Sequence, residues 1–120
     1  MRYITFVKMA EGLEDPPLAL QEAMGKEMGE AIAAGTMLEA GGLSGMRDST
    51  EIHLRSGTIT QVDGPYAEGK EVAGGYAITE VRSHEEAVEG ARRVLELHQQ
   101  YWPGWEGSVE IRQMFSAPGQ

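Results

Sequence analysis

Strand-like and helix-like segments alternate along the chain in an order that permits few folds. Two stretches carry apolar side chains at three- and four-residue spacing and are predicted as helices, one from Asp15 towards Gly35 and one from Ser83 towards Pro103. The other regular segments are rich in β-branched and aromatic residues and are predicted as strands: residues 1–9, 36–43, 50–54, 58–62, 72–81 and 108–115. This order predicts an α+β fold with both helices on one face of a mostly antiparallel sheet.

The first predicted helix is expected to bury one face. Asp15 is its expected cap, and Pro16 and Pro17 suit its first turn. Gly25 and Gly29 each cost about 1 kcal/mol relative to alanine in a helix interior, so we expect close packing against a neighbouring element to compensate. The positions predicted to be buried are Leu20, Met24, Met28, Ala31 and Ile32.

Local signals mark the other elements. Ser83 with Glu86 three residues later predicts a capping box at the start of the second helix. Residues 55–57 are short enough, and with Gly57 flexible enough, for the loop of a hairpin. Gly74 and Gly75 indicate a bulge or a close backbone approach within a strand. The apolar stripe predicted for the second helix comprises Ala87, Val88, Ala91, Val94, Leu95 and His98.

Size and charge exclude several classes of protein. A chain of 120 residues accommodates one core, so we expect one domain over residues 1–116 and a flexible tail over 117–120. A formal net charge of -9 would repel nucleic acid and anionic membranes, and no apolar run approaches the ~20 residues that cross a bilayer. Without cysteine there is no disulfide framework. We expect a cytoplasmic protein with neither a nucleic-acid nor a membrane partner.

The most informative motif is Val-Asp-Gly-Pro-Tyr-Ala-Glu-Gly-Lys-Glu at residues 62–71, followed by Gly-Gly-Tyr at 74–76. It resembles the DGPF branch of the YCII-related family, in which an Asp-Gly-Pro-Phe turn precedes an acidic stretch ending in Lys-Glu and then a Gly-Gly-aromatic strand. Tyr66 stands where phenylalanine gives the branch its name, and Gly69 stands where threonine is usual. The similarity covers nearly the whole chain, including the hairpin, Gly41-Gly42-Leu43 and Glu86-Ala87.

This resemblance implies a ferredoxin-like fold that pairs its sheets across a two-fold axis into a dimeric α+β barrel, and hence a homodimer. It implies no established reaction. The wider family is proposed to use a His-Asp pair, but no histidine lies in the first helix, where that family would place its own. The DGPF branch is often described alongside sigma factors of the extracytoplasmic-function type, which implies a transcription factor as one candidate partner.

Asp63 has two interpretations. Its side chain can accept hydrogen bonds from backbone amides two residues on, and Gly64 before a proline is pushed towards extended conformations, so the motif could be a rigid corner. Alternatively, the Asp63 carboxylate faces a small-molecule pocket and binds a ligand or takes a proton. That pocket would be lined near Asp63, Tyr66, Gly42 and Tyr76.

Further candidates surround this motif. Glu68 and Glu71 could form a carboxylate cluster for acid/base chemistry, or they could be solvated loop charges, one of them paired with Lys70. His53 is the histidine close enough in sequence to pair with Asp63 across the hairpin strands. The three histidines lack metal-ligand spacing, so we expect no metal, and no cofactor motif is present. Trp102 and Trp105 are expected to pack in the core or at a dimer contact.

Three hypotheses about function therefore remain open. The chain could be an enzyme of unknown reaction that uses Asp63 as an acid or base. It could be a module that binds a small molecule in the same pocket without catalysis. It could also be a protein-interaction module, which would leave a large apolar patch exposed outside the dimer interface.

Overall fold

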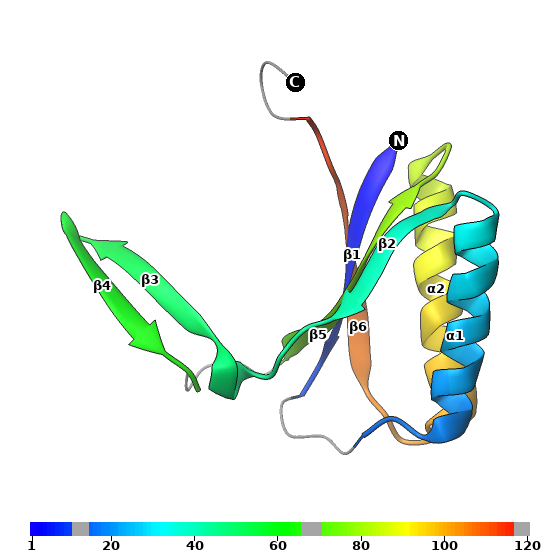
Figure 1. The fold of residues 1–120 in the computed structure, drawn as a ribbon, viewed down its shortest axis with the longest axis horizontal. Helices are drawn as coiled ribbons and strands as arrows, with labels where there is room; N and C mark the ends of the chain where they lie inside the picture. Colours follow the sequence, from blue (N-terminus) through cyan, green and yellow to red (C-terminus); the bar gives the residue numbers. More distant parts are fainter. Residues whose placement is uncertain (11–14, 66–70, 117–120) are drawn as a thin grey trace.

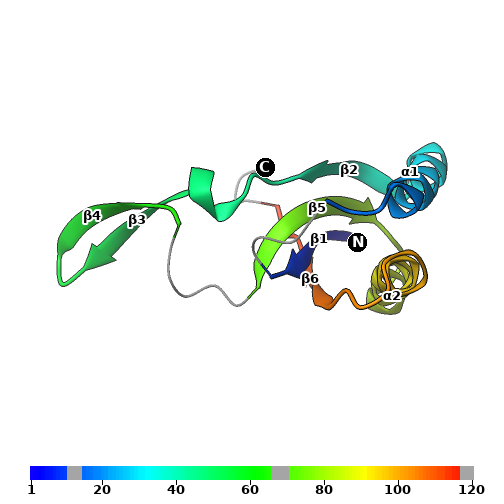
Figure 2. The ribbon, with the colours of Figure 1, turned by 90° about the horizontal axis from the view of Figure 1, so that it is seen from below.

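The computed structural model describes residues 1–10, 15–65 and 71–116. Its main body is a four-stranded antiparallel sheet in the order β2-β5-β1-β6, and both helices cover one face of this sheet (Figures 1 and 2). Strands β3 and β4 form a separate two-stranded sheet. The elements are β1 (Arg2–Met9), α1 (Leu18–Ala33), β2 (Met37–Gly42), the 3-10 helix η1 (Met46–Asp48), β3 (Thr50–Arg55), β4 (Thr58–Asp63), β5 (Val72–Glu80), α2 (His84–Tyr101) and β6 (Gly107–Gln113). The predicted α+β class and the single helical layer are confirmed.

Strand β1 lies in the middle of the sheet and pairs with β5 on one side and β6 on the other. The register with β5 shifts after Val7, because Val7 faces Gly75 while Lys8 faces Ala73. Gly74 is thus the extra residue of a bulge, as the paired glycines predicted. The helices cover one face of β1 only, although β1 carries apolar residues on both faces, a pattern typical of a strand that is covered on both.

The core lies between the sheet and the two helices, and α1 contributes Leu20, which is 2% exposed, as predicted. Tyr3 is 1% exposed and packs with Val81 and Ala87, and Ile111 of β6 joins them. An exposed contact joins the two helices: Arg93 Nε of α2 donates a 2.9 Å hydrogen bond to Glu27 Oε1 of α1. The buried residues of α2 are Ala87, Ala91, Leu97 and His98. The predicted stripe is correct at Ala87, Ala91 and His98, and it missed Leu97.

The first helix corrects three expectations. It begins at Leu18 after Pro17, which has extended backbone angles (φ -53°, ψ 145°), and no side chain caps it; Asp15 and the prolines therefore precede the helix. Ile32 is 57% exposed rather than buried, because α1 lies at the edge of the fold over β2, one of the two edge strands of the sheet. A side chain built at Gly25 or Gly29 would meet nothing within 4 Å, so no close packing explains these glycines.

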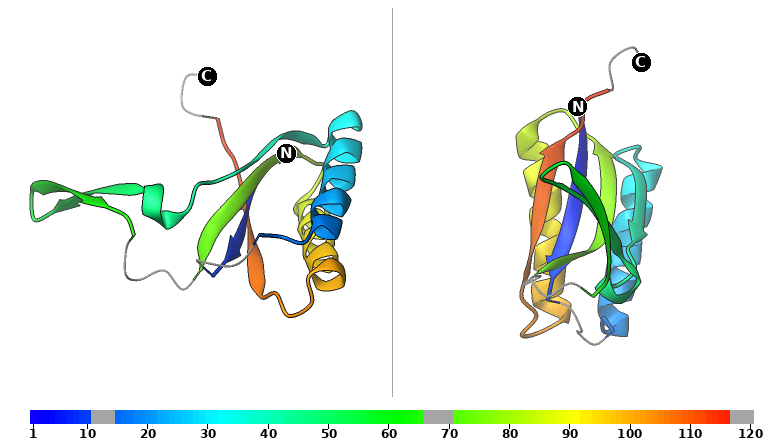
Figure 3. Two further views of the ribbon diagram at one scale, coloured as in Figure 1. Left: turned by 60° about the horizontal axis from the view of Figure 1, so that its bottom comes forward. Right: turned by 90° about the vertical axis from the view of Figure 1, so that its left-hand side faces the viewer.

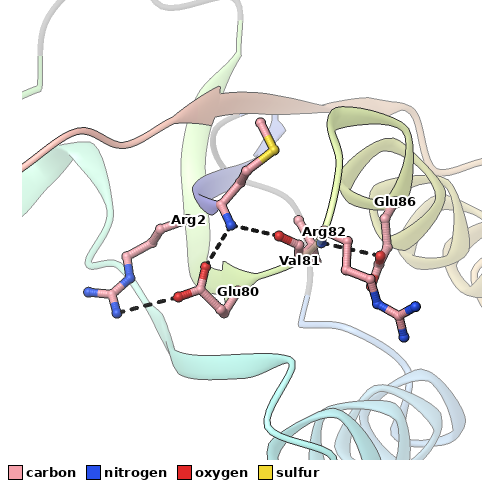
Figure 4. Close-up of polar contacts among 6 residues, drawn as sticks. Arg2, Glu80, Val81, Arg82 and Glu86 are labelled. Atoms are coloured by element: carbon pink, nitrogen blue, oxygen red, sulfur yellow. Dashed lines mark hydrogen bonds and ion pairs between the residues drawn. The ribbon is translucent and has the colours of Figure 1, made fainter.

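The start of α2 follows the prediction. Ser83 Oγ accepts a 3.1 Å hydrogen bond from the Glu86 amide, which satisfies one of the free N–H groups of the first turn. The reciprocal bond of the predicted capping box is displaced by one residue, because the Glu86 carboxylate accepts at 3.3 Å from the amide of Arg82 and not from that of Ser83. Figure 4 shows the contact between Arg82 and Glu86 together with the nearby N-terminus of the chain. The N-terminal ammonium group lies 3.0 Å from Glu80 Oε2 and donates a 2.8 Å hydrogen bond to the Val81 carbonyl oxygen.

The predicted hairpin is confirmed, but its loop is one residue shorter than expected, because Arg55 belongs to β3; β4 likewise extends by one residue, to Asp63. Ser56 and Gly57 form the turn, and both have positive φ angles (51° and 78°), as the favoured two-residue hairpin turn requires. Residues 50–63, here called the hairpin arm, project from the side of the sheet that the helices leave uncovered (Figure 3). No described helix is long and apolar enough to cross a membrane.

Candidate functional site

The sheet face opposite the helices presents an apolar centre. Because Tyr3 points to the helices, the even-numbered residues of β1 point away from them. Ile4 and Phe6 face Ile78 and Tyr76 of β5 in register, and all four side chains are only half-buried. We call the surface formed by Ile4, Phe6, Tyr76 and Ile78 the open sheet face.

Charged groups surround this apolar centre and neutralise one another. Lys8 Nζ lies 3.0 Å from Glu110 Oε1, and Arg2 lies 3.8 Å from Glu80. The N-terminal ammonium and Arg2 lower the pKa of Glu80 through the hydrogen bond and charge of the former and the charge of the latter. The open sheet face is therefore bordered by paired charges.

A polar pair stands within the open sheet face. Tyr76 on β5 donates a hydrogen bond to Glu39 Oε2 on β2, and Glu39 faces Ile78 in register. This hydrogen bond raises the pKa of Tyr76, with smaller contributions from burial and from the negative charge of Glu39. The Tyr76 hydroxyl thus stays protonated, and the two side chains present acceptor oxygens beside an apolar surface.

The two adjacent glycines of β2, Gly41 and Gly42, differ in how much space surrounds them. Gly41 faces Tyr76, and a side chain built there would place its Cβ 3.0 Å from Tyr76 Cε1. Gly42, the predicted site residue, faces Gly75, and its Cβ would lie 3.9 Å from the nearest atom, the Gly74 carbonyl oxygen. Gly41 is therefore the position where the absence of a side chain makes room for the tyrosine ring.

Asp63 lies elsewhere, at the end of β4 on the hairpin arm. It is exposed, and its Oδ1 accepts hydrogen bonds from Thr50 Oγ1 at 3.1 Å and Gln61 Nε2 at 3.2 Å. The expected backbone bond two residues on is excluded because Pro65 has no N–H. Asp63 and Tyr76 belong to two different sheets.

The residue after Asp63 is built into a corner. The Gly64 amide donates a 2.7 Å hydrogen bond to the Ser49 carbonyl, and the Gly64–Pro65 peptide bond is cis. A Cβ at Gly64 would overlap the carbonyl oxygen of Met46 in η1. This close approach supports the interpretation of the motif as a corner that seats the end of β4 against η1.

His53 and Asp63 point to opposite sides of the hairpin arm. In the register of β3 and β4, Asp63 faces Thr50 and His53 faces Thr60, so alternation along each strand separates the two side chains. His53 Nε2 instead lies 2.9 Å from Glu51 Oε1. The structure thus does not bring this histidine and aspartate together.

The other predicted site residues are placed in part. Glu71 Oε1 accepts a 3.0 Å hydrogen bond from Ser108 Oγ at the beginning of β6. Tyr66, Glu68 and Lys70 lie outside the described residues. Within residues 1–10, 15–65 and 71–116, no group of three or more histidine, aspartate and glutamate side chains is arranged to hold a metal ion.

Two clefts open at the end of α2, with volumes of about 320 and 670 Å³, and Trp102 and Trp105 line both. Trp105 packs on His98, with ring centroids 4.3 Å apart, and on Gly107, where a Cβ would overlap its indole ring. His98 is 6% exposed, and its Nδ1 donates to the Val94 carbonyl at 2.8 Å. The predicted packing role of Trp105 is confirmed, and so is the place of His98 in the buried stripe of α2.

The sequence profile of the YCII-related domain matches residues 1–99. The chain belongs to the YCII-related family. No curated protein matches the chain. The matched region ends within α2, while β6, which pairs with β1, follows it. The YCII-related domain of this chain therefore builds its sheet with a strand that lies beyond the matched residues.

Sequence reasoning missed Glu39 in this YCII-related domain. The available signal was a carboxylate two residues before Gly41 in an otherwise apolar and glycine-rich strand. Its relevance became visible only once β2 paired with β5 and placed Glu39 beside Tyr76, 37 residues away in sequence.

Proposed function

We propose that this YCII-related protein is a homodimeric module that binds a small molecule between two facing sheets, with Tyr76 and Glu39 at the centre of the site. The observation that carries the proposal is the hydrogen-bonded Tyr76–Glu39 pair on an apolar sheet face that the helices leave uncovered. Binding sites commonly combine an apolar surface with a few convergent polar groups.

The strand order supports a ferredoxin-like dimeric barrel as the frame of this site. Without the hairpin arm, the chain reads β1-α1-β2-β5-α2-β6, with β1 and β5 as the two central strands of an antiparallel sheet. Two such sheets packed face to face bury both open sheet faces, which stabilises the dimer by roughly 25 cal/mol for each Å² of apolar surface removed from water.

The hydrogen-bonding groups of the Tyr76–Glu39 pair indicate which class of ligand would fit the site. The Tyr76 hydroxyl has its proton engaged by Glu39, so both side chains offer acceptor lone pairs to a further molecule. The ligand class that fits is a small molecule with an apolar body and an amine or hydroxyl donor. A carboxylate ligand would instead place a second negative charge beside Glu39.

This geometry favours binding over acid/base catalysis by Asp63. A catalytic carboxylate is usually desolvated or crowded by a second charge, whereas Asp63 is exposed and bonded to two neutral side chains. His53 points to the opposite side of the hairpin arm. An enzymatic role would therefore use the Tyr76–Glu39 pair rather than Asp63 and His53.

Protein interaction is the second candidate function. The hairpin arm exposes large apolar side chains, with Ile52 and Ile59 each 71% accessible and Leu54 65%. A contiguous apolar patch of this kind is typical of a protein-binding surface. A transcription factor is the candidate partner that the resemblance to the DGPF branch adds.

Light scattering and a protein-observed NMR titration test the proposal together. We expect a mass of twice the 13.1 kDa chain at micromolar concentration. In two-dimensional NMR spectra, benzylamine should perturb the backbone signals of Gly41, Tyr76 and Ile78, whereas benzoate, matched in size but opposite in charge, should not. The Tyr76→Phe variant keeps the ring and removes the hydroxyl, so it should weaken the benzylamine response.

Two results would contradict the proposal. A mass near that of one chain would show that the protein is a monomer, in which no second sheet faces the open sheet face. Benzylamine shifts confined to the clefts around Trp102 and Trp105, unchanged in Tyr76→Phe, would place small-molecule binding away from the open sheet face.

A further inference from the structure

One side of the hairpin arm carries large apolar residues towards its tip, and the other side is mostly polar. In register, Leu54 faces Ile59, and alternation places Ile52 on the same side as both. This apolar side also carries Thr50, Gln61 and Asp63 nearer the base of the arm. The opposite side carries Glu51, His53, Arg55, Thr58 and Thr60, together with Val62. This alternation is the pattern of a strand pair that buries one side, yet the three apolar side chains are 65–71% exposed.

The arm does not fold back on its own domain. Strands β3 and β4 pair with each other and not with the four-stranded sheet. The radius of gyration is 16.3 Å, against about 14 Å expected for a compact chain of this length. Seen along the longest axis, the arm stands in front of the sheet while the helices lie behind it (Figure 3, right). It therefore extends into the space that a facing sheet would occupy.

The distribution of charge bears on which side of the chain a second copy could approach. The chain has a net charge of -9, so a second copy is repelled on most approaches. Both helices carry more acidic than basic residues. The charged groups that the strand register and their contacts place on or beside the open sheet face are balanced instead: four are positive (the N-terminus, Arg2, Lys8 and Arg112) and four are carboxylates (Glu39, Glu71, Glu80 and Glu110). Two copies can approach without net repulsion on this side, from which the arm projects.

We propose that the hairpin arm of one chain packs its apolar side, formed by Ile52, Leu54 and Ile59, against a second copy of the same chain. The inference rests on the proposed dimer, because a copy that faces the open sheet face meets the projecting arm. Two-fold symmetry makes the contact reciprocal, so each chain both extends an arm and receives one. The two arms close the sides of the space between the sheets and shelter the Tyr76–Glu39 pairs.

Matched charge substitutions on the two sides of the arm test this contact. Leu54→Glu and Thr60→Glu each add one carboxylate to an exposed strand position of the same hairpin, on the apolar and the polar side respectively. Circular dichroism should show both variants folded, because neither side chain is part of the core. Sedimentation equilibrium should give a dimer dissociation constant raised roughly tenfold or more by Leu54→Glu and much less by Thr60→Glu.

Isotope-filtered NMR on mixed labelled and unlabelled chains gives a direct second measurement. The methyl groups of Ile52, Leu54 and Ile59 should show contacts to the unlabelled chain. The arm inference would be wrong, while the proposed dimer stood, if Leu54→Glu had no effect and no intermolecular methyl contacts appeared. In that case the wild-type chain would still be a dimer, and Phe6→Glu on the open sheet face would still dissociate it. A monomeric wild-type chain would overturn both, and an arm that binds a different protein without affecting the dimer would overturn the inference alone.

Discussion

Tyr76 on β5 donates a hydrogen bond to Glu39 on β2, joining two residues 37 positions apart on the uncovered face of the sheet. The pair raises the pKa of Tyr76 above its usual value, mainly through the hydrogen bond to the carboxylate. It is the polar centre of the site proposed for this YCII-related protein, and most of what the site does can be tested through it.

The first prediction concerns the titration of Tyr76. Ultraviolet absorbance of tyrosinate should show a component that ionises above the usual pH range of tyrosine, and Tyr76→Phe should remove that component. Glu39→Ala should move the pKa of Tyr76 back towards its usual value because it deletes both the acceptor and the charge. The folded state holds the proton of the Tyr76 hydroxyl more tightly than the unfolded chain does. The contribution of the Tyr76–Glu39 hydrogen bond to stability is therefore complete below the pKa of the tyrosine in the unfolded chain. That contribution is lost as the pH rises through the folded pKa.

The second prediction concerns Glu80, which pairs with the N-terminal ammonium and with Arg2 (Figure 4). Both partners lower the pKa of its carboxylate in the folded state. The unfolded chain therefore binds the proton more readily, so the stabilisation is present above the unfolded pKa and is lost as the pH falls through the folded pKa. Chemical denaturation between pH 3 and pH 6 should show a shallower pH dependence in Glu80→Gln. An identical slope in wild type and variant would show that the pair does not contribute.

The third prediction compares two glycines with opposite surroundings. Gly29→Ala in α1 adds a methyl group where nothing lies within 4 Å, so it should stabilise the fold by roughly 0.5–1 kcal/mol through helix propensity. Gly107→Ala should destabilise it by about 1–3 kcal/mol, because the new Cβ overlaps Trp105 and the Lys8 carbonyl oxygen. Urea denaturation measures both. A destabilising Gly29→Ala would mean that α1 packs against something that a single chain does not show.

The fourth prediction concerns the cap of α2. Ser83→Ala removes the hydroxyl that accepts from the Glu86 amide and should cost about 1 kcal/mol of unfolding free energy. Because the cap is structural, benzylamine shifts at the open sheet face should be the same as in wild type. Unchanged thermal stability would indicate that the first turn of α2 finds another acceptor.

The fifth prediction separates Asp63 from Gly64 within the Asp-Gly-Pro motif. Asp63→Asn keeps an acceptor for Thr50 and Gln61, so stability should change by no more than about 0.5 kcal/mol. Gly64→Ala should be clearly more destabilising, because its Cβ would overlap the Met46 carbonyl oxygen. Thermal unfolding ranks the two variants. Loss of benzylamine binding in folded Asp63→Asn would restore Asp63 to the site and contradict the placement proposed here.

The amino-acid sequence by itself determined the local elements. Alternating apolar residues specified the strands, Ser83 specified the start of α2, and Ser56-Gly57 specified the hairpin turn, because each depends on residues a few positions apart. Local signals were less reliable at α1, where Asp15 could have capped a helix that instead begins after Pro17. The same limit applies to Gly25 and Gly29, because the space around a glycine depends on which element lies against it.

Only the tertiary structure decided which side chains meet. The pairing of β2 with β5 placed Glu39 and Gly41 beside Tyr76, and no pattern within either strand specifies that register. The pairing of β3 with β4 placed His53 and Asp63 on opposite sides of the hairpin arm, although their closeness in sequence had suggested a pair. A strand's alternation states which residues share a face, but the partner strand and its register determine what that face contacts.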